Sequence, residues 1–210
     1  MTATVASPAP PTTSTRILRF ALLAAAPLWL LGWAIMRVDG KYGPGPGWTS
    51  AHLIWVVAFA LFGFASLALF RIVGGNRRDV PAVGALGVAV LGAVTLVGQM
   101  LIDIAVGLGA TDKAAMRSRY DDVFAVPGVE LVLFQVGPSL LFVGLLALVV
   151  IATVRRRVRV TTLALVLLGV AMMVAGRPLP GWLRTVEGLG AVSMALALAP
   201  LSALVPARRR

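Results

Sequence analysis

Long apolar segments, separated by short stretches that contain most of the charged residues, run along the whole chain. The hydrocarbon core of a bilayer is about 30 Å thick and needs about 20 apolar residues for each helical crossing. Six segments meet this requirement, at about 16–36, 51–73, 81–108, 127–154, 160–176 and 186–205. We therefore predict an all-α fold, a polytopic integral membrane bundle of six transmembrane helices with no soluble domain between them.

The composition supports this prediction. Hydrophobic residues make up 59% of the 210 residues and charged residues 13%, against about 45–50% and about 25% in soluble domains. Residues 1–15 carry no charged side chain and are rich in Pro, Ser and Thr, so we expect a disordered cytoplasmic tail there. The transmembrane domain then covers 16–206, and 207–210 form a basic C-terminal tail. The first apolar run could mimic a cleavable signal, but it is long enough to cross the bilayer, which favours a retained span.

The formal net charge of +11 comes from Lys and Arg residues that lie mainly between the apolar segments. Both termini are expected in the cytoplasm, because this orientation puts the larger share of Lys and Arg on the cytoplasmic side. The clusters concerned are Arg71, Arg77, Arg78, Arg155, Arg156, Arg157, Arg159, Arg208, Arg209 and Arg210. No aromatic residues alternate with them, so they indicate contact with anionic membrane lipids and no nucleic-acid partner.

In this orientation most acidic residues, the only histidine and all five tryptophans lie toward the outer side. His52 and Trp55 lie near the start of the second span, and Trp29 and Trp33 lie in the outer half of the first. Tryptophan is common at membrane interfaces, but the inner interface would here have neither Trp nor Tyr. Two interpretations stay open, an aromatic belt and an aromatic-walled pocket that opens toward the outer face.

Asp103 is the one acidic residue that neither a solvated loop nor a favourable helix dipole explains. It lies about one turn before Gly107, at the end of its span where the helix dipole is negative. Burial and the dipole both disfavour its ionised form. Gln99 precedes it by four residues, so the two side chains are expected to share a face and a hydrogen bond. Ionisable groups inside membrane spans are candidate functional sites. The alternative is a hydrogen bond that only holds helices together.

A second polar group lies at the start of the fourth span. Glu130 and Gln135 are five residues apart, so α-helical geometry puts them only loosely on one side of the helix. Pro138 interrupts backbone hydrogen bonding there, which favours an internal cavity. Glu130, like Glu187 at the start of the last span, also fits a simpler role as a carboxylate at the positive end of a helix dipole.

Sequence arrangements that identify common enzyme classes are missing. The chain has one histidine and no cysteine, and it contains neither HExxH nor a phosphate-binding lysine loop. We therefore expect no metal and no cofactor. Acid chemistry in an apolar pocket remains, with Asp103 and Glu130 as the catalytic candidates. The substrate-binding candidates are Gln99, Gln135, His52, Trp29, Trp33, Trp55 and Glu187.

Three segments, GWTSAHLIW (47–55), GQMLID (98–103) and VPGVELVLFQVGP (126–138), resemble small six-helix membrane proteins of arginine- and alanine-rich bacterial proteomes. In size and helix content the chain is also similar to integral membrane terpene cyclases, in which acidic residues start the reaction. This likeness implies acid-initiated cyclisation or isomerisation of an isoprenoid-type lipophilic substrate in the bacterial cytoplasmic membrane. The alternative is a non-enzymatic membrane subunit, transport accessory or immunity protein, in a homodimer or a membrane complex, with Asp103 and Glu130 as a proton or cation site.

Overall fold

A computed structural model describes residues 12–177 and 179–206, so most of the predicted N-terminal tail and the basic tail at 207–210 lie outside the described residues. The part of the chain that it describes is helical and contains no strand, which confirms the predicted all-α fold. The long helices are α1 (Thr13–Val38), α2 (Pro46–Ile72), α3 (Val80–Leu108), α5 (Gly137–Val154), α6 (Val160–Gly176) and α7 (Thr185–Leu198). The shorter ones are η1 (Gly40–Tyr42), α4 (Lys113–Phe124), the π-helix η2 (Glu130–Val136), η3 (Gly181–Arg184) and η4 (Ala199–Leu204).

Within the described residues, five helical stretches are long and apolar enough to cross a membrane. They are α1, α2, α3, η2 with α5, and η3 with α7 and η4. The remaining predicted span, at 160–176, corresponds to α6, which is apolar but has only 17 residues. The structure is therefore that of a helical membrane bundle, with some element boundaries displaced from the prediction. In particular, α1 begins at Thr13, inside the predicted tail, and α2 begins at Pro46 rather than at residue 51.

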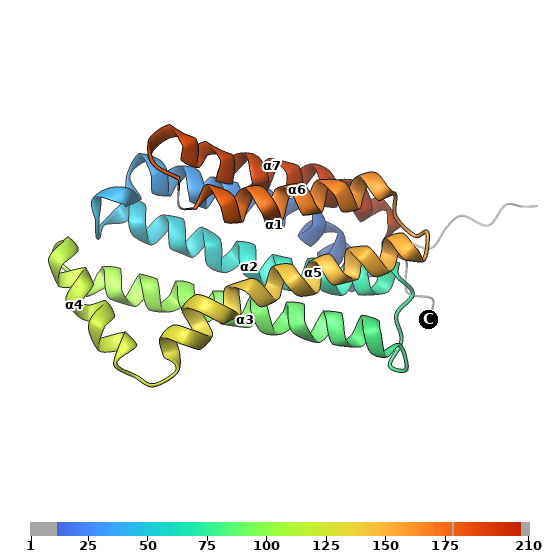
Figure 1. The fold of residues 1–210 in the computed structure, drawn as a ribbon, viewed down its shortest axis with the longest axis horizontal. Helices are drawn as coiled ribbons and strands as arrows, with labels where there is room; N and C mark the ends of the chain where they lie inside the picture. Colours follow the sequence, from blue (N-terminus) through green and yellow to red (C-terminus); the bar gives the residue numbers. More distant parts are fainter. Residues whose placement is uncertain (1–11, 178, 207–210) are drawn as a thin grey trace, which may run out of the picture.

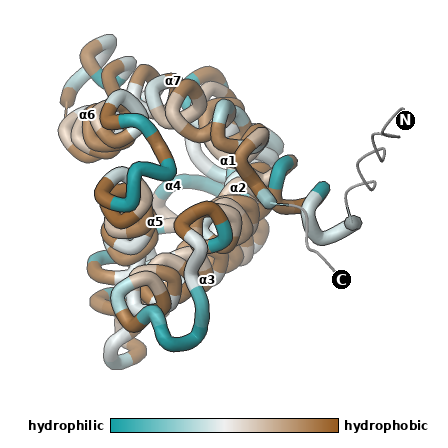
Figure 2. The backbone as a smooth tube through the Cα atoms, turned by 90° about the vertical axis from the view of Figure 1, so that its right-hand side faces the viewer, coloured by the Kyte–Doolittle hydropathy of each residue, from teal (hydrophilic) through white to brown (hydrophobic). Residues whose placement is uncertain are grey.

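The long helices run side by side, and the turns gather at the two ends of the bundle (Figure 1). The turn with η1, the helix α4 and the turn with η3 lie at one end, and the α2–α3 and α5–α6 turns lie at the other. Hydrophilic segments are concentrated in the turns, whereas the long helices are largely hydrophobic (Figure 2). Most acidic residues of the described chain belong to the first end, and the arginine clusters at 71–78 and 155–159 belong to the second, so these charges are segregated as predicted.

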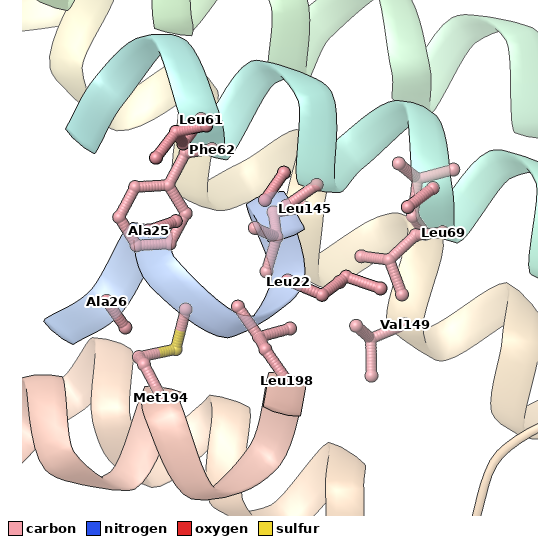
Figure 3. Close-up of a cluster of buried hydrophobic side chains, with 14 of the residues drawn as sticks. Leu22, Ala25, Ala26, Leu61, Phe62, Leu69, Leu145, Val149, Met194 and Leu198 are labelled. Atoms are coloured by element: carbon pink, nitrogen blue, oxygen red, sulfur yellow. The ribbon is translucent and has the colours of Figure 1, made fainter. Parts of the chain in front are cut away.

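The core lies between α1, α2, α5 and α7. Leu22, Phe62, Leu145 and Met194 come from these four helices and are almost completely buried around a shared centre (Figure 3). The helix α2 packs against α1, α3 and α5, whereas α3 packs mainly against α2 and α5 and exposes an apolar outer face. The exposed leucines and valines of α3 and α6 fit a lipid environment and not water.

Close contact between α3 and α5 depends on two glycines. A Cβ at Gly92 would collide with the backbone of α5, and a Cβ at Gly144 would collide with the α3 backbone at Ala89. Small residues at helix crossings let backbones approach in membrane proteins. The other glycines near the start of α3, Gly84 and Gly87, face open space, so they have no such role.

At the arginine-rich end, one ion pair joins the α2–α3 turn to the end of α5. Arg155 donates to both carboxylate oxygens of Asp79, at 2.5 and 2.9 Å, and also to the carbonyl of Val73 at 3.3 Å. Such a two-pronged contact fits the planar guanidinium. The hydrogen bond from Arg155 lowers the pKa of Asp79 below its ordinary value.

Candidate functional site

His52 and Asp103 form the most buried pair of ionisable side chains near the acidic end of the bundle. His52 lies in α2 and Asp103 in α3, and their residues are 3% and 5% exposed. His52 Nε2 lies 3.6 Å from Asp103 Oδ2, within ion-pair distance but too long for a direct hydrogen bond. Both residues are candidates from the sequence, and the fold brings them together.

The surroundings of the imidazole define which nitrogen carries a proton. His52 Nδ1 lies 2.7 Å from the carbonyl oxygen of Trp48. A carbonyl oxygen can only accept, so Nδ1 is the donor and carries hydrogen. In a neutral ring Nε2 is then an acceptor that faces the carboxyl of Asp103. Two facing acceptors repel each other, and a single proton on either partner converts the repulsion to attraction. The geometry therefore favours a His52–Asp103 pair that holds one proton.

The other oxygen of Asp103 binds a residue from the short helix α4. The Tyr120 hydroxyl donates to Asp103 Oδ1 at 2.5 Å. Burial, followed by the charge and hydrogen bond of Asp103, raises the pKa of Tyr120 above its ordinary value, so the phenol remains a donor. The tyrosine ring also contacts Phe124 and Phe134, with centroid distances of 5.7 and 6.3 Å. Through Tyr120, α4 is fastened over the end of α3.

Trp48, near the start of α2, also binds the end of α3 at Asp103. Its indole nitrogen donates to the backbone carbonyl of Asp103 at 2.9 Å, and its ring packs on His52 with a centroid distance of 4.2 Å. Gly107 makes room for the indole, because a Cβ there would collide with it. Trp48, His52 and Trp55 occur at helical spacing along α2. Trp48 and His52 contact Asp103 of α3, whereas the Trp55 indole nitrogen binds a carbonyl of α1.

Asp103 lies in the wall of a broadly open cavity of about 580 Å³ beneath α4, whose lining mixes apolar and charged side chains. A large part of the lining comes from α4, whose lining residues recur every three or four positions and so share one face of that helix. The lining residues are Met36, Gly40, Lys41, Gly43, Trp48, Gln99, Asp103, Lys113, Met116, Arg117, Tyr120, Asp121, Phe124 and Phe134. We call this space the polar cavity.

A second cavity, of about 310 Å³, lies deeper in the bundle and is mostly apolar and aromatic. It is lined by Trp29, Trp55, Phe59, Leu96, Gln99, Met100, Pro138, Ser139, Phe142, Val143, Leu146, Val170, Met173, Val174, Arg177 and Glu187. We call it the apolar cavity. The helices α5 and α6 diverge from the turn that joins them (Figure 1), and the lining residues Val143 and Val174 on their facing sides are 59% and 62% exposed. The cavity therefore opens sideways between α5 and α6.

Gln99 lines both cavities. The predicted hydrogen bond between Gln99 and Asp103 is absent, because Tyr120 occupies one carboxyl oxygen and His52 faces the other. Gln99 Oε1 is instead buried without a hydrogen-bond partner. A buried acceptor without a partner costs free energy unless a ligand or water satisfies it. Gln99 is thus a polar contact point at the boundary between the two cavities.

Glu187 forms a separate polar cluster at the edge of the apolar cavity. Its Oε2 accepts from the indole nitrogen of Trp33 at 3.0 Å and from Arg37 at 2.9 Å. The Arg37 guanidinium also lies 5.5 Å from the centre of the Trp33 ring. Through these two bonds to Oε2, Glu187 ties α7 to α1, while the residue still lines the apolar cavity for which it was predicted as a substrate-binding side chain.

Trp29 and Trp55 line the apolar cavity, and the indole nitrogen of Trp55 donates to the Trp29 carbonyl at 3.0 Å. Trp55 also meets His52 edge-on, with a centroid distance of 5.1 Å. Of the two interpretations of the tryptophans, these two residues fit the pocket. Trp182, which is 78% exposed, fits an interface belt instead.

Glu130 and Gln135 contact each other, but not in the way that α-helical geometry predicts. Both belong to the π-helix η2, whose wider turn brings residues five apart onto one face, and Gln135 donates to Glu130 Oε1 at 3.0 Å. The same wide turn continues to Gly137, whose amide donates to the carbonyl of Val132 five residues earlier. The next residue, Pro138, has no amide hydrogen to donate. Both side chains are exposed and line neither cavity. The two predicted catalytic acids are therefore not brought together.

Residues that could hold a metal do not cluster in the part of the chain that the structure describes, where no group of three His, Asp or Glu side chains is found.

The sequence interpretation missed Tyr120 and Trp48 as partners of the site. For Tyr120 a signal was available, because Met116, Tyr120 and Phe124 recur every four residues after Asp112, whose side chain caps α4 through the amides of two alanines. Comparisons with protein-family models, with curated proteins and with solved structures find no match to this chain.

Proposed function

We propose that the chain crosses the bacterial cytoplasmic membrane six times, with both termini in the cytoplasm. The five long helical stretches and α6 would be the spans. A 17-residue helix is about 26 Å long, at about 1.5 Å per residue, which is near the lower limit for a crossing. The arginine-rich end of the bundle would face the cytoplasm, as the positive-inside rule requires, and the two cavities would then lie toward the outer side.

Within this arrangement, we propose that the protein is an enzyme that cyclises or isomerises a lipophilic, isoprenoid-type substrate by proton transfer. The observation that carries the proposal is the position of Gln99, a polar residue that lines both the apolar cavity and the cavity whose wall contains Asp103. A lipophilic molecule could reach the apolar cavity from the bilayer, between α5 and α6. Its polar or unsaturated end would then lie near the one proton-holding pair of the bundle.

The proposed reaction needs no oxidant or further reactant. The proton held by His52 and Asp103 is transferred from Asp103 to one carbon of a substrate double bond, whose π electrons form the new C–H bond. The resulting carbocation either shifts the double bond or is attacked by a second double bond, and loss of a different proton to the carboxylate regenerates the acid. Trp29 and Trp55, which line the apolar cavity, supply ring faces that stabilise a cation, and the apolar walls exclude water.

The test is turnover by the purified protein in lipid nanodiscs. Wild type, Asp103→Asn and Glu130→Gln are incubated with a panel of prenyl alcohols, prenyl phosphates and apolar polyenes in deuterated water, and products are identified by mass spectrometry. We expect an isomeric product with one deuterium incorporated per proton added. Asp103→Asn should lower the rate at least about a hundredfold, as expected for loss of a general acid. Glu130→Gln serves as the matched control and should keep the wild-type rate, because Glu130 lines neither cavity. No conversion by wild type, or full turnover by Asp103→Asn, would reject the proposal.

A second candidate is a non-enzymatic role, as a subunit or transport accessory that binds a proton. It is favoured by the fact that both oxygens of Asp103 face protein partners, Tyr120 and His52, so that neither points freely into a cavity. A stoichiometric partner recovered from native membranes in mild detergent, together with no conversion in the assay above, would support this role.

A further inference from the structure

Three cations face the polar cavity without an anionic partner. They are Lys41, Lys113 and Arg117, and among the described residues none of them takes part in an ion pair. Lys113 and Arg117 are four residues apart, on the face of α4 that covers the cavity. The Lys41 ammonium lies 5.0 Å from the centre of the Tyr42 ring, a contact with a side chain that carries no negative charge.

The acidic residues of the same cavity do not cancel these charges. Two carboxyl groups, those of Asp103 and Asp121, belong to its lining. The carboxyl of Asp103 faces His52 on one oxygen and accepts from Tyr120 on the other, so it has no free oxygen to offer a cation. Asp121 is four residues beyond Arg117 but forms no ion pair with it. The three cations thus outnumber the single free carboxylate, and the cavity favours an anion.

Among the described residues, Gln99 is the one lining residue that the polar and apolar cavities share, so a molecule that occupied both would have to pass this side chain. Their volumes, about 580 and 310 Å³, lie in or near the range of small-molecule sites in proteins. An occupant of both would need a hydrocarbon tail for the aromatic end and a charged group for the basic end, with Gln99 between them.

We infer that the protein binds an anionic amphiphile, whose phosphate-type headgroup contacts Lys41, Lys113 and Arg117 in the polar cavity and whose hydrocarbon tail enters the apolar cavity past Gln99. The inference deepens the proposed function, on which it rests for the assignment of this molecule as substrate. The same cations could take a free phosphate ion, and the choice of probes separates the two sources.

The test measures equilibrium binding to the protein in nanodiscs of zwitterionic lipid, without turnover. The probes are radiolabelled decyl phosphate, decanol and inorganic phosphate. We expect decyl phosphate to bind at least about tenfold more tightly than either of the others, because only it uses both cavities. The double variant Lys113→Gln with Arg117→Gln should weaken decyl phosphate binding about tenfold and leave decanol unaffected, since it removes two charge-assisted contacts.

Arg119→Gln is the matched control, because Arg119 carries the same charge on the same helix but does not line the polar cavity. It should change the affinity by less than about twofold. Val143→Trp places a larger side chain in the wall of the apolar cavity. It should therefore weaken the binding of decyl phosphate but leave the binding of inorganic phosphate unchanged.

Equal affinities for decyl phosphate and decanol, or equal losses in Arg119→Gln and the double variant, would overturn the inference. If inorganic phosphate binds as tightly as decyl phosphate, the amphiphile is rejected in favour of a free anion. A protein that binds decyl phosphate through these cations but converts no substrate would support the inference and reject the enzymatic proposal, so the two failures are distinguishable.

Discussion

The His52 imidazole and the Asp103 carboxyl face each other across 3.6 Å in the interior of the bundle, and the carbonyl of Trp48 holds the opposite nitrogen of the ring. Each of the three residues depends on the others for its position. Trp48 packs on His52 and donates to the Asp103 backbone, so the start of α2 and the end of α3 form one rigid corner. Proton chemistry at this corner would take place in a fixed geometry, which is a requirement for efficient transfer.

Removal of the Tyr120 hydroxyl should release α4. Tyr120→Phe keeps the ring contacts but loses the hydrogen bond to Asp103, which at a charged or partly charged acceptor contributes about 1.5–3 kcal/mol. We expect amide hydrogen exchange in 113–124 to become at least about tenfold faster, with little change in α2. The comparison variant is Phe124→Leu, which removes a ring contact of α4 but keeps the Tyr120 hydroxyl and its hydrogen bond to Asp103. Unchanged exchange in Tyr120→Phe would contradict a role for this bond in holding α4.

The same bond predicts an alkaline limit. The pKa of Tyr120 is raised in the fold, so the folded protein keeps this proton more tightly than the unfolded chain does. The contribution to stability is complete below the ordinary tyrosine pKa of about 10 and is lost as pH rises above it. Protection of α4 against exchange should therefore fall above about pH 10 in wild type, after correction for intrinsic exchange rates. Tyr120→Phe should lack this step, and an identical fall in both proteins would rule out Tyr120 as its cause.

Gly92 should tolerate no larger residue. Gly92→Val would force the backbones of α3 and α5 apart, and overpacking of this kind costs about 1–3 kcal/mol or more. Gly87→Val makes the same chemical change on the same helix where a Cβ meets open space, and we expect it to leave stability almost unchanged. Thermal unfolding in detergent measures both. Similar midpoints for the two variants would show that the crossing at Gly92 is less close than the structure indicates.

The ion pair at the arginine-rich end should make the bundle sensitive to acid. The pKa of Asp79 is lowered by the hydrogen bond from Arg155, so its contribution to stability is present above the ordinary value of about 3.9 and disappears as pH falls through the lowered pKa. Asp79→Asn should lower the unfolding midpoint at pH 7 and have a smaller effect at pH 2.5. Arg77→Gln, in the same turn, is a control that changes the charge by one unit in the opposite sense without breaking an ion pair, since Arg77 forms no ion pair with an acid in the described chain.

Apolar length and periodicity were sufficient to predict the helical bundle, because every span must satisfy its own backbone hydrogen bonds in lipid. The same reasoning found Asp103 and His52 as unusual residues. Their meeting could not be predicted, since it depends on which helices are neighbours. The expected bond between Gln99 and Asp103 was wrong for this reason, because a tyrosine from another helix binds the carboxyl in place of the local i, i+4 partner.

The contact between Glu130 and Gln135 could not be predicted from the sequence either. A π-helix changes the angular spacing of side chains, so Glu130 and Gln135 meet although α-helical spacing separates them. Helix α4 was not predicted either, because its residues are mostly polar or charged. Its one apolar stripe, with Met116 and Phe124, is meaningful only where the bundle provides a surface for it.

The tautomer and protonation state of His52 are the direct test of whether the His52–Asp103 pair holds one proton. His52 is the only histidine of the chain, so protein labelled with ¹⁵N-histidine gives one pair of ring nitrogen signals in solid-state NMR. We predict an Nδ1 that carries hydrogen at neutral pH and an Nε2 signal that is displaced by protonation or by the facing Asp103 carboxyl, and that shifts strongly in Asp103→Asn. A ring with hydrogen on Nε2 and a bare Nδ1, or an Nε2 signal that is the same in wild type and Asp103→Asn, would contradict a proton held between His52 and Asp103.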